Sequence, residues 1–533
     1  MKIRIYTYTL IFFILLELVS GCRKELSELY NDPDQTVNPS IPELFTEMLD
    51  NDRIRPSYWN VRTFLVMHAG IYTQSVGYLN IPSVYQQNPS YTEDYWNDFY
   101  ISGPNGGGVM VHFRSIEEAY DGMTNATDKQ EMAVFVEAAR AMMLDQASQM
   151  VDLWGDIPYS EAGYINSGTE SLAPKFDHDV DVYGEILNQL KTTSTFFASV
   201  TLSPSAQANF KKQDILLQGN LDLWRRYVNS LRLRLLMRIS YYDENRARTE
   251  VLEMLNDPLT YPLVDGASGY QPASTDILLQ PLVTYKENLR NAFTELNNDP
   301  APGYMLNEVM KPADDPRIPV MFDKYGRTVN DVFVPNSDYI GMPADMNSED
   351  QQKNLGLFAI RDSATFQFNT KLPGIVLTAA EVNFLKAEAF ERWGGGDAQT
   401  AYETAIRQSV TFYYYLNSLN TVTAAPLPMP DNAVLDAFLQ KPSIQYAGSS
   451  QEKLIRIWTQ KWLHFDILQS NQSWAEYRRT KYPQLSFYTT SLSGYEQPPN
   501  RLVYPSSESA YNPNYASVKN KDLRENRVFW DVK

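Results

Sequence analysis

The chain is poor in cysteine, and Cys22 is the only one in 533 residues. No disulfide can form within the chain, so the stability of the fold has to come from packing. Long hydrophobic runs are lacking as well. Residues 10–16 (LIFFILL) are apolar, but Glu17 follows directly, and a helix needs about 20 apolar residues to cross a bilayer. We therefore do not predict a permanent transmembrane helix at this stretch.

Positive charge is also scarce. The chain has 46 Lys and Arg residues against 64 Asp and Glu residues, which gives a net charge of −18. Because proteins that bind nucleic acid neutralise phosphates with a basic face, this composition argues against nucleic acid as a partner. An acidic surface also repels anionic lipid, so we expect the folded body to stand away from a membrane surface.

Signatures of catalysis and of metal binding are missing. The chain has four histidines, which are His68, His112, His178 and His464. They lack the ligand spacing of H-E-x-x-H and similar zinc motifs, and no G-x-S-x-G elbow occurs. The glycine triplets at 106–108 and 394–396 lack the Lys-Ser/Thr of a phosphate loop. DPDQ at 32–35 lacks the full set of oxygen ligands of a calcium loop. We predict no enzyme activity, cofactor or metal site.

A glycoside hydrolase is the enzyme class that the acidic residues could suggest. Such an enzyme needs two carboxylates roughly 5–10 Å apart around the sugar bond, and Asp152, Asp156 or Glu161 might be proposed for that role. In a chain with 64 acidic residues, pairs of this kind are frequent by chance. They carry little weight as a sign of catalysis.

The position of Cys22 indicates lipid attachment. Lys2 and Arg4 precede the apolar stretch in the order of a secretory signal peptide, and VSGC at 19–22 resembles a bacterial lipobox. We predict a signal peptide over 1–21 and a lipidated tether over 22–40. At about 0.8 kcal/mol per buried methylene, two or three acyl chains hold a protein firmly on a membrane. A buried free thiol is the alternative, but it does not explain this location.

The remainder of the chain, residues 41–533, is predicted to be a single, mainly α domain. Apolar residues recur at helical spacing in seven windows, at 131–155, 181–197, 221–242, 245–257, 378–416, 450–467 and 472–480. We read 131–155 with 181–197, and 221–242 with 245–257, as helix pairs. The window 378–416 contains a pair of its own. Helix, short break and helix is the pattern of a tetratricopeptide array.

Local signals refine these windows. Thr378 and Glu381 have the spacing of a capping box, and Asp397 is placed to cap the following helix. Gly155 is expected to end the first helix. Trp458, Trp462 and Phe465 recur at helical spacing and are predicted to be core residues. Arg478 and Arg479 are expected to pair with carboxylates or to bind helix carbonyls.

Two aromatic-rich stretches lie outside the helical windows. One covers residues 72–100, and the other covers residues 258–377, which contain many prolines and glycines. Long loops in a compact domain are usually functional, and tyrosine combines a flat apolar face with a polar tip. We therefore predict a helical scaffold mainly over 115–257 and 378–480, with ligand-facing loops at 70–110 and 258–377 over one end of it.

Several motifs together resemble the SusD/RagB family of surface lipoproteins. They are the lipobox cysteine, DLWGDIPYSEA (152–162), AEVNFLKAEAFERWG (380–394), TQKWLHFDILQSNQSWAEYRRTKYP (459–483) and RLVYPSSESAYNPNY (501–515). Each is weak by itself, but the five in this order cover nearly the whole mature chain. The resemblance implies a fold of eight helices in four tetratricopeptide units, overlaid by a loop-rich subdomain, and a protein without enzyme activity.

The resemblance also implies a function at the cell surface. Members of the family bind oligosaccharide or polysaccharide, and they act as a lid on a SusC-like TonB-dependent transporter in the outer membrane. Peptides are the ligand in the RagB-like branch, so a peptide-binding lid is the alternative. A purely structural surface protein that binds nothing is a third reading.

Candidate ligand contacts come from the two aromatic-rich stretches, because aromatic rings stack on the apolar faces of sugars. They are Tyr78, Tyr85, Tyr91 and Trp96 in the first stretch and Phe333, Tyr339 and Phe358 in the second. This choice depends on composition and position. For each residue a packing role is the alternative, and Trp96 with Tyr100 could simply mark one face of a helix.

Overall fold

The computed structural model describes residues 40–55, 57–103, 106–164, 173–281, 289–295, 300–420 and 425–533. Its longer helices are α2 (Ile41–Leu49), η1 (Asn60–Gly70, a π-helix), α3 (Pro89–Tyr100), α4 (Val109–Asp121), α5 (Ala126–Trp154), α6 (Asp179–Ser199), α7 (Pro204–Gln213), α8 (Leu221–Arg238), α9 (Glu244–Asn256), α14 (Ala379–Trp393), α15 (Ala398–Ser418), α16 (Asn432–Leu439), α17 (Ser450–Phe465) and α18 (Ser470–Thr480). Every helical window predicted from the sequence is a helix. None of the helices in the described part is long and apolar enough to cross a membrane.

Shorter elements fill the connections. The short helices are α10 (Pro272–Thr275), α11 (Leu289–Thr294), η2 (Tyr304–Met310), η3 (Lys311–Ala313), α12 (Ile318–Met321), α13 (Ser348–Lys353), η4 (Leu355–Leu357), η5 (Ser363–Gln367), α19 (Ser506–Tyr511) and η6 (Pro513–Ser517). The strands form antiparallel pairs, which are β1 (Ser102–Gly103) with β2 (Gly106–Gly107), β3 (Ile157–Pro158) with β4 (Phe176–Asp177), β5 (Ile277–Leu279) with β10 (Gly374–Leu377), β6 (Phe322–Asp323) with β9 (Ile360–Arg361), and β7 (Gly326–Val329) with β8 (Val332–Pro335).

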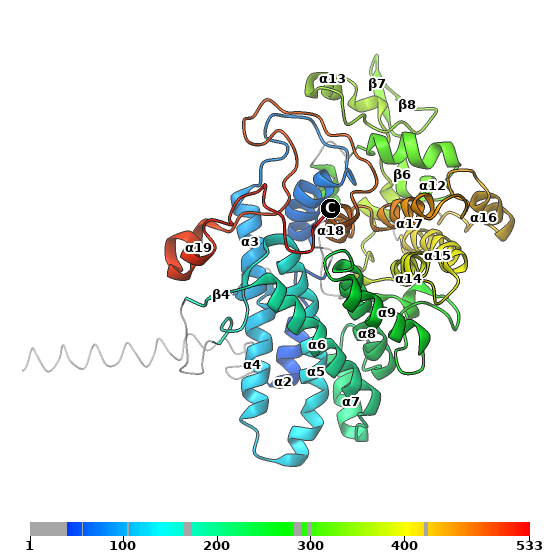
Figure 1. The fold of residues 1–533 in the computed structure, drawn as a ribbon. Coiled ribbons are helices and arrows are strands. Elements are labelled where there is room, and N and C mark those ends of the chain that lie inside the picture. The colour runs from blue at the N-terminus through cyan, green and yellow to red at the C-terminus, as the bar shows by residue number, and fades with distance from the viewer. Residues whose placement is uncertain are drawn as a thin grey trace, which may run out of the picture.

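The helices pack in pairs along the chain. The most extensive helix contacts join α14 to α15, α6 to α8, α4 to α5, α14 to α17, α2 to α4 and α5 to α6 (Figure 1). The predicted pairs are in contact, α5 with α6 and α8 with α9, but α5 contacts α4 and α6 contacts α8 more extensively. A four-residue turn joins α4 to α5, and α5 is buried on all sides from Ala141 to Trp154. It consequently contacts α4 and α6 together, and α6 takes α8 as its main partner.

The predicted helix ends are confirmed except for one side chain. Gly155 ends α5 with a φ of 75°, and Asp397 accepts a hydrogen bond from the Thr400 N–H at the start of α15. Thr378 caps α14, but Glu381 does not complete a capping box. Its carboxylate instead accepts hydrogen bonds from Arg234 of α8, at 2.6 and 2.7 Å. The ion pair with Arg234 on another helix therefore replaces the hydrogen bond that Glu381 would make within a capping box.

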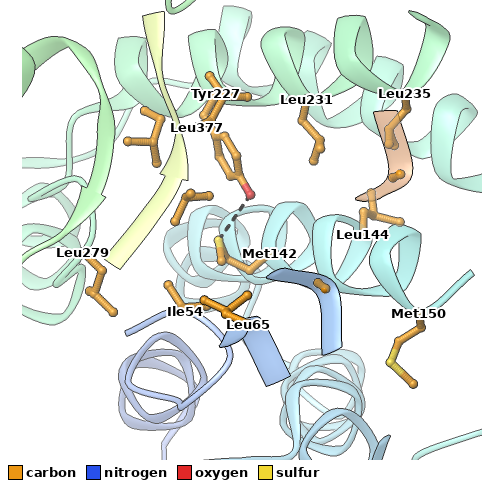
Figure 2. Close-up of a cluster of buried hydrophobic side chains, with 14 of the residues drawn as sticks. Ile54, Leu65, Met142, Leu144, Met150, Tyr227, Leu231, Leu235, Leu279 and Leu377 are labelled. Carbon is orange, nitrogen blue, oxygen red and sulfur yellow. Dashed lines mark hydrogen bonds between the residues drawn. The ribbon is translucent and has the colours of Figure 1, made fainter. Parts of the chain in front are cut away.

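The core lies between α5 and α8 and continues under the β5–β10 ribbon. Figure 2 shows Met142 and Leu144 of α5 facing Tyr227, Leu231 and Leu235 of α8. Each of these side chains is at most 1% exposed. The Tyr227 hydroxyl donates to Asp145 Oδ2 at 2.7 Å and lies 3.6 Å from Met142 Sδ. This buried hydroxyl therefore has a hydrogen-bond partner. The predicted core residues Trp458, Trp462 and Phe465 are buried as well.

A buried network of charges joins four helices. Arg479 of α18 donates to Glu388 of α14, at 2.7 and 2.6 Å, and to Glu476 of its own helix, at 3.0 and 2.6 Å. Lys461 of α17 also contacts both carboxylates. Glu476 then accepts a hydrogen bond from Arg238 of α8 at 3.1 Å. The pairing predicted for Arg479 is thus confirmed, and because none of these residues is more than 7% exposed, water screens the network little.

Two aspartates connect this network to the end of the chain. Arg238 Nη1 donates to Asp152 Oδ2 of α5 at 2.5 Å, and the indole N–H of Trp530 donates to Asp152 Oδ1 at 2.8 Å. Trp530 is fully buried, and Asp531 accepts a hydrogen bond from Lys481 at 2.6 Å. Val528, Trp530 and Asp531 are therefore buried against the helical scaffold, whereas Val532 and Lys533 are exposed.

The two aromatic-rich stretches meet over one end of the scaffold. Asn80 Nδ2 donates to the carbonyls of Ala344 and Met346, both at 2.7 Å, and the Asn80 N–H donates to Gln351 Oε1 at 2.6 Å. Figure 1 shows β7, β8 and α13 at the top of the molecule, beyond the ends of α15 and α17. Arg361 of β9, fully buried, fixes this region to the scaffold by donating to Asp466 Oδ2 at 2.5 Å and to the Ser75 carbonyl.

Candidate ligand-binding site

The segment between η1 and α3 is held by distant parts of the chain. Gln74 Nε2 donates to the Ser486 carbonyl at 2.6 Å. Gln87 pairs with the backbone of Val503 in both directions, because its Nε2 donates to the Val503 carbonyl at 3.0 Å and its Oε1 accepts from the Val503 N–H at 2.9 Å. These bonds fix a loop that contains almost no regular structure of its own.

A pocket of about 270 Å³ lies in this loop. It is only slightly smaller than the roughly 300–1,000 Å³ of small-molecule sites. Its walls come from η1, the loop and the first residues of α3, and the lining residues are Met67, His68, Ile71, Tyr78, Ile81, Ser83, Val84, Gln86, Gln87, Asn88 and Pro89. We call this cavity the Tyr78 pocket. Ser83, Gln86 and Pro89 are exposed at its mouth, so solutes can reach it.

His68 is a fixed, uncharged part of the pocket wall. Its Nδ1 donates to the Thr63 carbonyl at 2.8 Å, and its Nε2 accepts a hydrogen bond from the Asn88 N–H at 3.1 Å. Burial lowers the pKa of His68 to about 4. The imidazole is therefore neutral at physiological pH, and it ties η1 to the start of α3.

Tyr78 is the one aromatic residue other than His68 among the lining residues, and further aromatic residues lie near it. Tyr78 and Tyr91 are half-buried, and burial, with a smaller contribution from Tyr91, raises the pKa of Tyr78. Burial and Glu295 raise the pKa of Tyr58, again with a contribution from Tyr91, to about 12. The hydroxyls of Tyr78 and Tyr58 are therefore protonated at physiological pH. Trp59, 42% exposed, packs edge-on against Tyr58 with ring centroids 5.6 Å apart.

An ion pair lies beside these rings. Arg62 Nε donates to Glu295 Oε2 at 3.2 Å, and the Tyr58 hydroxyl donates to the same oxygen at 2.6 Å. Arg62 Nη1 is buried and has no hydrogen-bond partner among the described residues. The pair leaves an N–H donor of Arg62, unused by any described residue, near Tyr58 without adding net charge.

The sequence-predicted site residues fall into different environments. Tyr78 lines the pocket, whereas Tyr91 on α3 is not one of the lining residues. Tyr85, Trp96 and Phe358 are 3%, 1% and 4% exposed, so none of them has a free ring face for a ligand. Trp96 belongs to α3, where its indole N–H donates to Glu508 at 3.2 Å. These three side chains therefore have the packing role that was the alternative to ligand contact.

Phe333 and Tyr339 lie at a separate place. Phe333, on strand β8, is 55% exposed and packs edge-on against Tyr325 with ring centroids 6.1 Å apart. Tyr339 is half-buried, with Lys324 Nζ 5.2 Å from its ring centroid. These side chains remain candidates for a second contact surface.

The sequence-based prediction missed the aliphatic part of the pocket, and it left Trp59 and Arg62 outside the ligand-facing loops. Tyr58-Trp59 directly precedes a helix, a signal that the predicted loop boundary at residue 70 left out. Met67 and Ile71 are four residues apart on η1, a spacing that ordinarily indicates core packing. Cys22 lies outside the described residues, and the described residues contain no group of three or more metal-ligating side chains.

The neutral lining leads to a prediction about pH. Ligand affinity at the Tyr78 pocket is expected to change by less than about twofold between about pH 5.5 and 8. His68 stays neutral over that range because its pKa in the folded protein is about 4, and the other lining residues carry no charge. Titration calorimetry at several pH values measures this. A steep dependence near pH 6.5 would show that His68 is solvated and titrates.

The structure thus combines a scaffold of packed helices with an uncharged pocket built by a loop. The chain matches the model of the SusD-like family, described as starch-binding and associating with the outer membrane, over residues 30–505. The chain therefore belongs to the SusD-like family. This membership confirms the resemblance, the mainly α tetratricopeptide-type fold and the absence of an enzyme function predicted from the sequence.

Solved structures share this fold. The chain is similar to a chitin-binding protein, with a TM-score of 0.72 and 21% identity over 93% of this chain and 100% of that one. A chitin-binding SusD homolog from Flavobacterium johnsoniae has a TM-score of 0.67 and 21% identity, covering 92% and 99%. A SusD homolog from Bacteroides fragilis has a TM-score of 0.69 and 19% identity, covering 92% and 99%. No curated protein sequence matches the chain.

Proposed function

We propose that this protein captures oligosaccharides at the cell surface through the Tyr78 pocket. The observation that carries the proposal is a solute-accessible pocket of about 270 Å³, lined by Tyr78, on the fold of a family described as starch-binding. Sugar rings have apolar faces that stack on aromatic rings, while the amides and hydroxyls of the pocket mouth suit their hydroxyl groups. Two of the similar structures are described as chitin-binding, which supports a glycan ligand.

Delivery to a transporter completes the proposed function. We infer that Cys22 carries the lipid, that the acidic body extends from the outer membrane on residues 22–40, and that it passes cargo to a SusC-like TonB-dependent transporter. The family description as associating with the outer membrane supports this location. Co-purification of a TonB-dependent transporter with the lipidated protein tests the partnership.

Replacing Tyr78 by alanine is expected to weaken glycan binding at least tenfold. Losing a stacked ring removes roughly 0.5–1.5 kcal/mol beyond the loss of buried area, and about 1.4 kcal/mol is a factor of ten in affinity. Calorimetry or affinity electrophoresis against a panel of glycans and peptides gives the measurement. The free energy of unfolding should fall by less than about 2 kcal/mol, because Tyr78 is only half-buried.

Phe333→Ala serves as the matched control. Its ring is more exposed and belongs to the β7–β8 hairpin, so the variant should bind as well as the parent protein. Loss of binding in Phe333→Ala with full binding in Tyr78→Ala would move the site to the hairpin. Binding of peptides and of no glycan would favour the RagB-like alternative.

A Cys22→Ala variant is expected to leave the membrane fraction. Without acyl chains nothing in the described fold spans a bilayer, and the lipid supplies the membrane affinity. Fractionation, with metabolic labelling by a fatty-acid probe, measures this. A variant that stays in the membrane and a parent protein that takes up no label would contradict lipid anchoring.

A further inference from the structure

The inner wall of the Tyr78 pocket is aliphatic. Met67, Ile71, Ile81 and Val84 all line it, and Ile71 and Val84 are each 5% exposed. A sugar hydroxyl placed against this wall would lose its hydrogen bonds to water without gaining others, and that loss is unfavourable. A methyl group placed there would instead gain from burial. The wall therefore favours a ligand group that ends in a methyl.

The pocket is also uncharged. None of its lining residues is Asp, Glu, Lys or Arg, and His68 has both ring nitrogens engaged. The nearby Arg62 is paired with Glu295, and the chain as a whole is strongly acidic. A uronic acid or a sulfated sugar would find no unpaired cation in the pocket, so the group that enters it is neutral.

Polar groups at the pocket mouth are available for a ligand. The side chains of Tyr78, Ser83 and Gln86 form no hydrogen bond to any described residue, whereas Gln87 is fully engaged with Thr92 and the Val503 backbone. The Gln86 amide and the two hydroxyls offer both donors and acceptors. They match a ligand group with one N–H and one carbonyl.

We propose that the Tyr78 pocket selects an acetamido sugar, a 2-acetamido-2-deoxyhexose. An acetamido group combines a methyl for the aliphatic wall with an N–H and a carbonyl for the mouth, and it is neutral. This inference rests on the proposed glycan-binding function and names its substrate class. A hexose with a hydroxyl at the same carbon lacks the methyl and leaves the wall uncovered, so it binds more weakly.

The test compares two trisaccharides that differ only at carbon 2. The β-1,4-linked trimer of N-acetylglucosamine carries acetamido groups where cellotriose carries hydroxyls. Calorimetry with the purified protein should show at least tenfold tighter binding of the N-acetylglucosamine trimer. The deacetylated glucosamine trimer, which lacks the methyl and is cationic, should bind no better than cellotriose.

Two variants test whether the preference for the N-acetylglucosamine trimer over cellotriose originates in the pocket. Ile81→Ser removes part of the aliphatic wall and should reduce binding of the N-acetylglucosamine trimer about tenfold while leaving cellotriose binding unchanged. Ile340→Ser is the control, because Ile340 is 40% exposed and does not line the pocket. Circular dichroism and thermal unfolding check that both variants fold.

The possible results separate this inference from the proposed function. Equal affinity for the two trimers, or tighter binding of cellotriose or of a 6-deoxyhexose oligosaccharide, overturns the acetamido assignment and leaves glycan capture in place. An acetamido preference that survives in Ile81→Ser overturns the pocket as its origin. Binding of peptides alone, or of no ligand in the panel, overturns both.

Discussion

A Glu388→Gln variant is expected to lose about 3–5 kcal/mol of unfolding free energy, because it leaves Arg479 and Lys461 buried with one carboxylate fewer. Breaking a buried ion pair by removing one partner typically costs this much. Glu388 is fully buried and contacts both cations. Denaturant unfolding followed by circular dichroism measures the change.

The stabilisation by the Glu388 carboxylate is expected to decrease as the pH falls. Burial raises the pKa of Glu388, but the charges of Arg479 and Lys461 outweigh burial and lower it to about 2. The stabilisation by this carboxylate is therefore present above its unfolded-state pKa, about 4.5, and is lost as the pH falls towards 2. The difference between the parent protein and Glu388→Gln should shrink over that interval.

An exposed ion pair provides the control. Arg226 and Asp222 on α8 form a hydrogen-bonded pair at 2.6 Å, but the Asp222 side chain is 61% exposed. Asp222→Asn should cost less than about 1 kcal/mol. If Glu388→Gln proves as mild as Asp222→Asn, the buried network does not hold the helices together.

A Trp530→Ala variant is expected to lose about 3–5 kcal/mol of unfolding free energy. The substitution empties a fully buried site and removes the indole N–H that donates to Asp152. Arg238 and Arg478 also lie over the ring, 5.4 and 5.0 Å from its centroid. Thermal unfolding of the variant should show a much lower midpoint.

The stability of Trp530→Ala is to be compared with that of two other variants. Trp530→Phe keeps most of the ring but not the hydrogen bond, so it should fall between the parent protein and Trp530→Ala. Tyr511→Ala, at a side chain that is 83% exposed, should change the unfolding free energy by no more than about 0.5 kcal/mol. Equal stability of Trp530→Ala and Tyr511→Ala would mean that the segment 528–533 is not part of the folded core.

The helical scaffold could be predicted from the sequence because its signals are local. Apolar periodicity identified α5, α6, α8, α9, α14, α15, α17 and α18, and Gly155 and Asp397 marked helix ends correctly. Helix partners could not be predicted in the same way. A helix such as α5, which is buried on all sides over its C-terminal half, has no single apolar face that identifies one neighbouring helix. For the same reason Glu381, which pairs with Arg234 from another helix, was misread as part of a local cap.

The candidate site could be predicted only as a region. Composition indicated an aromatic-rich loop, and Tyr78 lines the pocket in it. Composition does not show which ring of a loop faces the solvent, so Tyr85 and Trp96, both buried, could not be separated from Tyr78. The aliphatic wall could not be recognised, because Met67 and Ile71 on a helix have the pattern of ordinary core residues.

The residues that anchor the pocket loop differ from those that face its cavity. Gln74 and Asn80 hold the loop through hydrogen bonds to backbone carbonyls elsewhere, whereas Ile81, Ser83 and Gln86 line the space itself. A library that varies only these three positions should therefore change cargo preference without unfolding the protein. The scaffold can in this way acquire new ligands by a few substitutions at a time.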